Sequence, residues 1–197
     1  MQEFGPAVTL NDPAFIHPTA QIYGKVTIGT GVSVWINAAI RSESQDITIG
    51  DYTNIQDFVM LHVGYGKGVH VGRHCSITHH VTLHGCTVGD NCLIGINTTI
   101  MDGCVIGDNC IVGAHTFLKE GTVIPDNSIV AGSPGAVRKT RNSFVENRMN
   151  AFFYYHNGLA YAEGNHRRWQ DPDFLELAGK EMEKLRGELT ALSEEAG

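Results

Sequence analysis

The sequence lacks the features that mark several common classes of protein. It contains no run of about 18 apolar residues, and residues 1–5 include neither the basic segment nor the apolar core of a secretion signal. Its five cysteines are odd in number and form no CxxC pair, which favours a reducing compartment over a disulfide scaffold. Positive charge is scarce, because 14 Lys and Arg are set against 21 Asp and Glu. We therefore expect a cytoplasmic protein that binds neither nucleic acid nor a membrane.

Proline is scarce as well, at 6 residues, whereas glycine is abundant, at 23 of 197. The apolar fraction of 42% is too high for a disordered chain, and the glycine content is too high for a helical bundle. This combination predicts a packed fold with many tight turns. Histidine is also in excess, at 10 residues.

Aliphatic residues recur every six positions through most of the chain. The step of six is uninterrupted from Val88 to Val130 and is broken in places between Leu10 and Leu83. The residue four positions after nearly every one of these aliphatics is small or β-branched, so the two types share one face of a short strand. The next residue after the aliphatic is often glycine, where we expect a corner to need backbone freedom. A six-residue unit of strand and turn predicts a parallel β-helix over residues 1–135, and the pattern resembles the left-handed, triangular kind with three hexads to a coil.

The breaks in the period predict where the chain leaves the coils. They follow Ile40, Leu61 and Leu83, each the third hexad of a coil, so the irregular segments should bulge from one corner. The largest is the glycine-rich loop 63–70. After residue 135 the period becomes helical, and we expect one helix from an N-cap at Ser143 to about Glu163 and a second from Asp171 and Pro172. Residues 136–197 should pack on the all-β core or cap it, within one structural domain.

The repeat predicts where three of the histidines lie in the coils. His62 and His84 follow the third-hexad aliphatic of successive coils, and a coil spacing of ~4.8 Å brings their imidazoles close enough to share a metal ion. His79 lies in the preceding hexad, near a different part of the triangle, and its spacing to His84 favours it over His80 as a ligand. If three copies pack about a threefold axis, His79 of one can complete the pair of its neighbour. Three imidazoles with a fourth position open are typical of catalytic zinc.

The motifs around these histidines resemble those of the γ-class carbonic anhydrases. The matching stretches cover roughly residues 10–161 and are Asp51-Tyr52-Thr53-Asn54-Ile55-Gln56-Asp57, Leu61-His62, His79 through Leu83-His84-Gly85-Cys86, Ala131-Gly132-Ser133-Pro134 and Asn150-Ala151-Phe152-Phe153-Tyr154 with Tyr161. The resemblance implies a homotrimer with three metal ions at its interfaces, each held by His62, His79 and His84.

The resemblance also implies roles for residues beside the metal. Gln56 would orient the metal-bound solvent, Arg41 and Asp57 would form an interface ion pair, and Tyr154 would approach from the C-terminal helix. The chain departs from the family in reading Arg41-Ser42-Glu43 where the family has Arg-x-Asp, so the carboxylate of Glu43 is one methylene longer.

Loop 63–70 is a second departure from the family. It contains no acid of the kind that some members use to export the proton, which leaves His70 as a candidate for this role.

The activity implied by the resemblance is the reversible hydration of CO₂ to bicarbonate. Three neutral ligands leave Zn²⁺ its full charge, which lowers the pKa of its water toward ~7 and provides a zinc-bound hydroxide to attack CO₂. Fe²⁺ or Co²⁺ could occupy the same ligands. Three alternatives stay open: an acyltransferase that uses acyl-CoA and a histidine base, a metal-assisted thioesterase, and a metal-binding trimeric scaffold with little or no activity.

Overall fold

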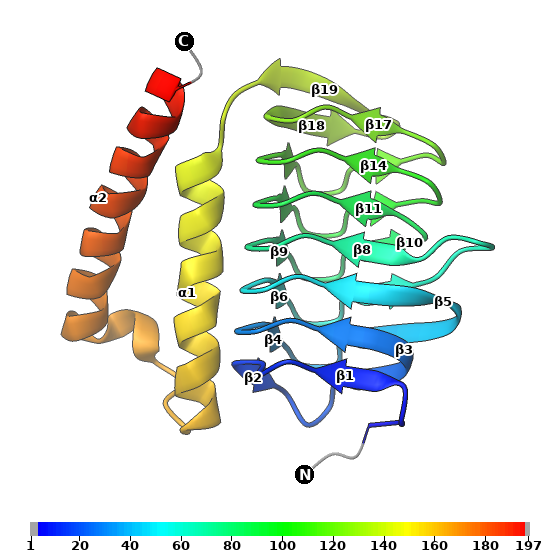
Figure 1. Cartoon of the computed structure of the whole chain (residues 1–197), viewed down its shortest axis with the longest axis horizontal. Coiled ribbons are helices and arrows are strands. Elements are labelled where there is room, and N and C mark those ends of the chain that lie inside the picture. Colours follow the sequence, from blue (N-terminus) through cyan, green and yellow to red (C-terminus); the bar gives the residue numbers. More distant parts are fainter. Residues whose placement is uncertain (1–3, 196–197) are drawn as a thin grey trace.

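The computed structural model describes residues 4–195 and confirms a parallel β-helix with a C-terminal helical extension (Figure 1). The coils stack as a prism with three faces, and the inward aliphatic residues of the hexads fill its interior. Leu83, Ile100 and Val112, for example, are 0% exposed. Apart from Leu10, which is exposed, and Ile16, which is partly buried, the hexad aliphatics therefore form one continuous hydrophobic core, as the period of six predicts.

The strands sort into three faces by their parallel pairing. The first face holds β1 (Val8–Leu10), the ends of β3 (Gln21–Ile28) and β5 (Ala39–Ile49), β8 (Val69–Val71), β11 (Thr87–Val88), β14 (Val105–Ile106) and β17 (Val123–Ile124). The second face holds β2 (Phe15–Ile16), β4 (Ser33–Val34), β6 (Asn54–Ile55), β9 (Ser76–Ile77), β12 (Leu93–Ile94), β15 (Ile111–Val112) and β18 (Ser128–Gly132). The third face holds the starts of β3 and β5 with β7 (Met60–His62), β10 (Thr82–His84), β13 (Thr99–Ile100) and β16 (Phe117–Leu118).

The irregular segments leave the prism at one corner, as predicted. The breaks after Ile40, Leu61 and Leu83 all fall between the third face and the first, which we call the third corner. There β5 continues around the corner, and loop 63–68 projects from the stack on the side away from the helices (Figure 1). We call the junction of the first and second faces the first corner, and that of the second and third faces the second corner.

The glycines after the hexad aliphatics have a different cause from the one expected. A positive φ is not required at Gly29, Gly50 or Gly107, because the left-handed backbone conformation occurs at other corner residues, many of them asparagine, such as Asn109 with φ 56°. Instead, a Cβ added at Gly50 would lie 2.6 Å from the backbone carbon of Gly72 in the next coil. Close contact between coils, and not backbone freedom, excludes a side chain at these positions.

The segment after the last regular coil first turns back on the sheet. Strand β19 (Gly135–Thr140) pairs antiparallel with β18, so strand structure extends five residues beyond residue 135. Helix α1 (Phe144–Ala162) then begins after Ser143 as predicted, although Oδ1 of Asn142 and not the Ser143 hydroxyl accepts from the N–H of Phe144, at 2.9 Å. A short 3₁₀ turn (Arg168–Gln170) leads to α2 (Pro172–Glu195).

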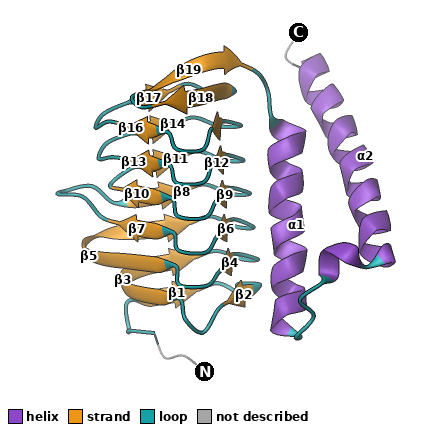
Figure 2. Ribbon diagram, turned by 180° about the vertical axis from the view of Figure 1, so that it is seen from behind, coloured by secondary structure: helices purple, strands orange, loops and turns teal. Residues whose placement is uncertain are grey.

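Both helices lie along the side of the prism (Figure 2). Helix α1 packs on the second face against β2, β4, β6 and β9, and α2 packs on α1 through Phe174, Ala178 and Leu185. Nδ2 of Asn147 donates to the carbonyl oxygens of Asn91 and Cys110, at 2.9 and 3.1 Å, which ties α1 to two coils. Neither helix, over the part of the chain that is described, offers a stretch long and apolar enough to cross a membrane.

Candidate metal centre

Two of the three predicted ligands meet at the third corner. The register of β7 with β10 pairs His62 with His84, and the register of β5 with β7 places Arg41 beside His62. Nδ1 of His62 lies 3.0 Å from Nε2 of His84. Two nitrogens bound to one tetrahedral zinc ion at ~2.0–2.1 Å lie roughly 3.3 Å apart, so this pair fits a shared metal ion with little movement.

A carboxylate contacts the other ring nitrogen of each histidine in this pair. Oε2 of Glu43 lies 3.1 Å from Nε2 of His62, and Oδ1 of Asp102 lies 2.8 Å from Nδ1 of His84. A carboxylate on the second nitrogen of a ligating histidine fixes the tautomer and orients the ring. The metal would therefore contact Nδ1 of His62 and Nε2 of His84, the two nitrogens that face each other.

The third predicted ligand, His79, lies at the second corner, two residues after the end of β9. Its Nδ1 is 2.9 Å from Oδ2 of Asp57, so Nε2 is the nitrogen left for a metal. The neighbouring His80 has φ 59° and its ring stacks on that of Phe58 with centroids 4.9 Å apart. The structure thus uses His80 in a corner stack and leaves His79 with the same carboxylate arrangement as the other two histidines.

The three histidines do not converge within one chain. Among the described residues, no group of three His, Cys, Asp or Glu is placed to hold a metal ion. The donor set nevertheless fits zinc, since each of His62, His79 and His84 has one nitrogen engaged by a carboxylate and one directed elsewhere. The pair and the third histidine lie at opposite edges of the third face, which is the displacement that the hexad frame predicts.

The environment of His62 favours the neutral ring that binds metal. Its pKa lies below the ordinary 6.5, first because of desolvation by burial and then because of the positive charges of Arg41 and His84.

A chain of hydrogen bonds fixes Gln56 from helix α1. Nε2 of Gln56 donates to Oδ1 of Asn54 at 2.9 Å, Nδ2 of Asn54 donates to Oγ of Ser76 at 2.9 Å, and this hydroxyl donates to Oδ1 of Asn150 at 2.7 Å. Gln56 is 2% exposed in the single chain. Such a chain polarises along its length and holds the amide of Gln56 in one orientation.

Tyr154 lies on α1 between the rings of Trp35 and Trp169, with centroids 5.6 and 5.5 Å away. Burial raises its pKa to about 12, with smaller contributions from Asp57 and Tyr161. Asp57 contacts His79, so Tyr154 lies within electrostatic range of a carboxylate beside a predicted ligand. Its hydroxyl is therefore a proton-bearing hydrogen-bonding group across the physiological pH range.

Arg41 and Asp57 have separate partners within the chain. Arg41 contacts Glu43, which also contacts His62, and Asp57 contacts His79. The carboxylate of Glu43 thus lies at the third corner beside His62, and that of Asp57 lies at the second corner beside His79.

His70, the candidate for proton export, lies on β8 with Nδ1 3.0 Å from Oγ1 of Thr48.

Asp102 is a residue of the site that could not be recognised from the family resemblance. Its signal was available, since it follows His84 by 18 residues, the length of one regular coil.

The chain is similar to one family of repeats and to three known proteins. The family described as bacterial transferase hexapeptide (six repeats) matches residues 85–120. A "Probable carbonic anhydrase" of Methanocaldococcus jannaschii is 47% identical over 81 residues, which cover 41% of this chain and 51% of that protein. Gamma carbonic anhydrase 1, mitochondrial, of Arabidopsis thaliana is 38% identical over 109 residues, 52% of this chain and 39% of that protein. A crystal structure from Bacillus cereus described as a "putative acetyltransferase" superposes with a TM-score of 0.74 at 30% identity, covering 78% of this chain and 91% of that one.

These matches differ in extent. The chain spans about half the length of the first curated relative and less of the second, whereas the solved structure is covered almost throughout.

Proposed function

The chain belongs to the hexapeptide-repeat proteins as a γ-carbonic-anhydrase-like member, and on this premise we propose that it is a metal-dependent lyase that hydrates CO₂ reversibly to bicarbonate. Zn²⁺ is the proposed metal, and Fe²⁺ or Co²⁺ suits the same three imidazoles. A reducing cytoplasm is the proposed location, in keeping with five cysteines that are all buried and free.

One observation carries the proposal. Each of His62, His79 and His84 is oriented by its own carboxylate, respectively Glu43, Asp57 and Asp102. A carboxylate partner is not required for a histidine at a solvated corner, whereas metal-binding histidines regularly have one.

A homotrimer is part of the proposal because one chain holds only part of the site. The third face and its second corner also expose apolar side chains, with Phe58 50%, Met60 42% and Phe117 37% exposed. Packing of this face against neighbouring copies would bury these side chains and would bring His79 of one protomer to the pair His62 and His84 of the next.

The chain's own residues supply orientation and charge around the site. A zinc ion held by three neutral imidazoles lowers the pKa of a bound water and so supplies a nucleophile near neutral pH. Gln56, fixed through its amide nitrogen, has its carbonyl oxygen left to orient the reacting water. Arg41 and Asp57 would pair across the interface, and Tyr154 would hold a hydrogen bond at the His79 side. Glu43 keeps His62 in the tautomer that leaves Nδ1 unprotonated.

Stopped-flow measurement of CO₂ hydration on protein of known metal content tests the proposal. We expect activity that rises with metal content to one ion per chain, and we expect His84→Ala to lose both the metal and the activity. His166→Ala changes an exposed histidine outside the site and serves as the control. A His84→Ala protein with a full complement of metal would overturn the ligand assignment, and an inactive, fully loaded trimer would favour the scaffold alternative.

Acyl transfer is the second candidate, because the B. cereus structure with the high TM-score is described as an acetyltransferase. In that case a histidine would act as a general base and no metal would be needed. Full acyl transfer from acyl-CoA by metal-free protein would decide for this function, whereas metal-dependent release of free thiol from acyl-CoA would indicate a thioesterase.

A further inference from the structure

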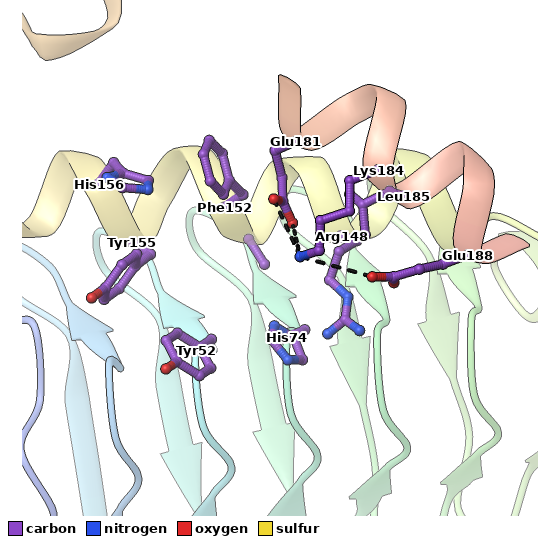
Figure 3. Close-up of a pocket in the computed structure, with 11 residues that line it drawn as sticks. Tyr52, His74, Arg148, Phe152, Tyr155, His156, Glu181, Lys184, Leu185 and Glu188 are labelled. Atoms are coloured by element: carbon purple, nitrogen blue, oxygen red, sulfur yellow. Dashed lines mark hydrogen bonds and ion pairs between the residues drawn. The ribbon is translucent and has the colours of Figure 1, made fainter. Parts of the chain in front are cut away.

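A cavity lies at the first corner, which is the vertex of the triangle opposite the third face. Its volume is about 340 Å³, and it lies between the prism and the two helices. Figure 3 shows Tyr52 and His74 on the prism side, Arg148 and Phe152 from α1, and Leu185 from α2. This volume is at the lower end of the range for small-molecule sites. A trimer that packs through the third face would leave this corner open.

Arg148 is the unusual group in this cavity. Within residues 4–195, its side chain has no hydrogen bond and no salt bridge, and its Nε is buried without a partner. Its guanidinium carbon lies 5.3 Å from the centroid of the Phe144 ring. The two glutamates that line the cavity are engaged elsewhere, because Nζ of Lys184 lies 3.1 Å from Glu181 and 3.8 Å from Glu188 (Figure 3).

An unpaired guanidinium in a half-buried position costs free energy, and the structure offers no carboxylate at salt-bridge distance to offset this cost. Burial also lowers the pKa of Arg148, and the charges of Glu188 and Glu181 oppose this only partly. A planar guanidinium binds a carboxylate through two parallel hydrogen bonds. The group that Arg148 lacks is therefore an anion of this geometry.

The remaining walls define the rest of the ligand. The rings of Tyr52, Phe152 and Tyr155 give the cavity an apolar, aromatic lining. His74 is neutral at pH 7, because burial and then the charges of Arg148 and Arg73 lower its pKa to about 4. Burial likewise lowers the pKa of His156. The two histidines thus add no positive charge at neutral pH.

The charges around the cavity limit the anion to a single negative charge. Arg148 and Lys184 balance Glu181 and Glu188, so the glutamates would repel a dianion such as sulfate. We propose that this cavity is a binding site for a small monocarboxylate with an aromatic body, whose carboxylate pairs with Arg148 while its ring packs against Phe152 and Tyr155. This site is separate from the metal centre and does not depend on the proposed function.

Isothermal titration calorimetry with benzoate tests the site on the full-length protein. We expect one benzoate per chain, with binding at least tenfold weaker for benzamide, which has the same shape and no charge. Arg148→Gln should weaken benzoate binding at least tenfold. Arg148→Lys should have an intermediate effect, because it keeps the charge and loses the planar fork. Arg186→Gln, on the exposed side of α2, is the matched control.

Circular dichroism and metal content confirm that each variant is folded. The proposal is wrong if benzoate does not bind, if benzamide binds as well as benzoate, or if Arg148→Gln binds benzoate unchanged. Sulfate that binds more tightly than benzoate would also contradict it, since the two glutamates should exclude a dianion.

Discussion

The half-buried ring of His74 makes the free energy of unfolding depend on pH. The ring stacks on Tyr52, with centroids 5.1 Å apart, and desolvation lowers its pKa to about 4. In the unfolded chain the same imidazole titrates near 6.5, so below that pH the unfolded state binds the proton first. The stabilisation is complete above pH 6.5 and is lost as the pH falls toward 4. Between pH 7.5 and 5.0 the linkage relation gives a loss of about 2 kcal/mol from this one residue.

The variant His74→Asn should remove this part of the pH dependence. Asparagine tolerates the left-handed conformation that His74 adopts, with φ 55°, and does not titrate. Urea unfolding followed by circular dichroism, at pH 7.5 and 5.0 and at one protein concentration, gives the free energy of unfolding for both proteins. All other titrating groups, including His156, remain in both, so their contributions cancel in the difference. Equal losses in the wild type and in His74→Asn would refute the argument.

Further predictions concern single substitutions at the contacts between coils and on helix α2. Asp102→Asn should weaken zinc binding by about 10- to 100-fold in a competitive chelator titration, because it removes the carboxylate that orients His84. Gly64→Ala should weaken zinc binding in the same assay, since its Cβ would overlap Oδ1 of Asp102. Gly107→Ala should destabilise the fold by about 1–3 kcal/mol in urea unfolding, because its Cβ would overlap the carboxylate of Asp126, whereas Gly187→Ala, in open space on α2, should stabilise by about 0.5–1 kcal/mol.

Regular repetition explains why so much of the prism could be predicted. Once three hexads make a coil, each residue's neighbours in the next coil are set by the sequence spacing. The contact between His62 and His84 follows from this register, as does the position of the breaks at one corner. The corner glycines were located correctly but explained wrongly. A need for backbone freedom and a need for close packing both favour glycine in the sequence. The ordinary φ of Gly50 and its contact with the next coil identify close packing as the cause.

The contacts between the helices and the prism could not be predicted in the same way. Ser76 and Asn150 are 74 positions apart and belong to segments with different periods, one of six and one of 3.6. No spacing rule links the two segments, so the hydrogen-bond chain to Gln56 stayed hidden. The cavity beside Arg148 stayed hidden for the same reason, because His74 and Arg148 reach it from different segments.

Asp102, the carboxylate beside His84, corresponds to aspartates that link neighbouring coils at the first corner, but it has a different partner. At the first corner, Oδ1 of Asp108 accepts the backbone N–H of Asp90 at 2.7 Å, and Oδ1 of Asp126 accepts that of Asp108 at 2.8 Å. At the third corner, Asp102 instead reaches the ring of His84.

Space for this comes from Gly64 and Gly85, since a Cβ at either would overlap Oδ1 of Asp102. Both glycines lie close behind a predicted ligand, Gly64 two residues after His62 and Gly85 one residue after His84. An aspartate that links neighbouring coils at the first corner thus orients a histidine at the third corner. Because both glycines leave room for this aspartate, they belong to the site together with Asp102.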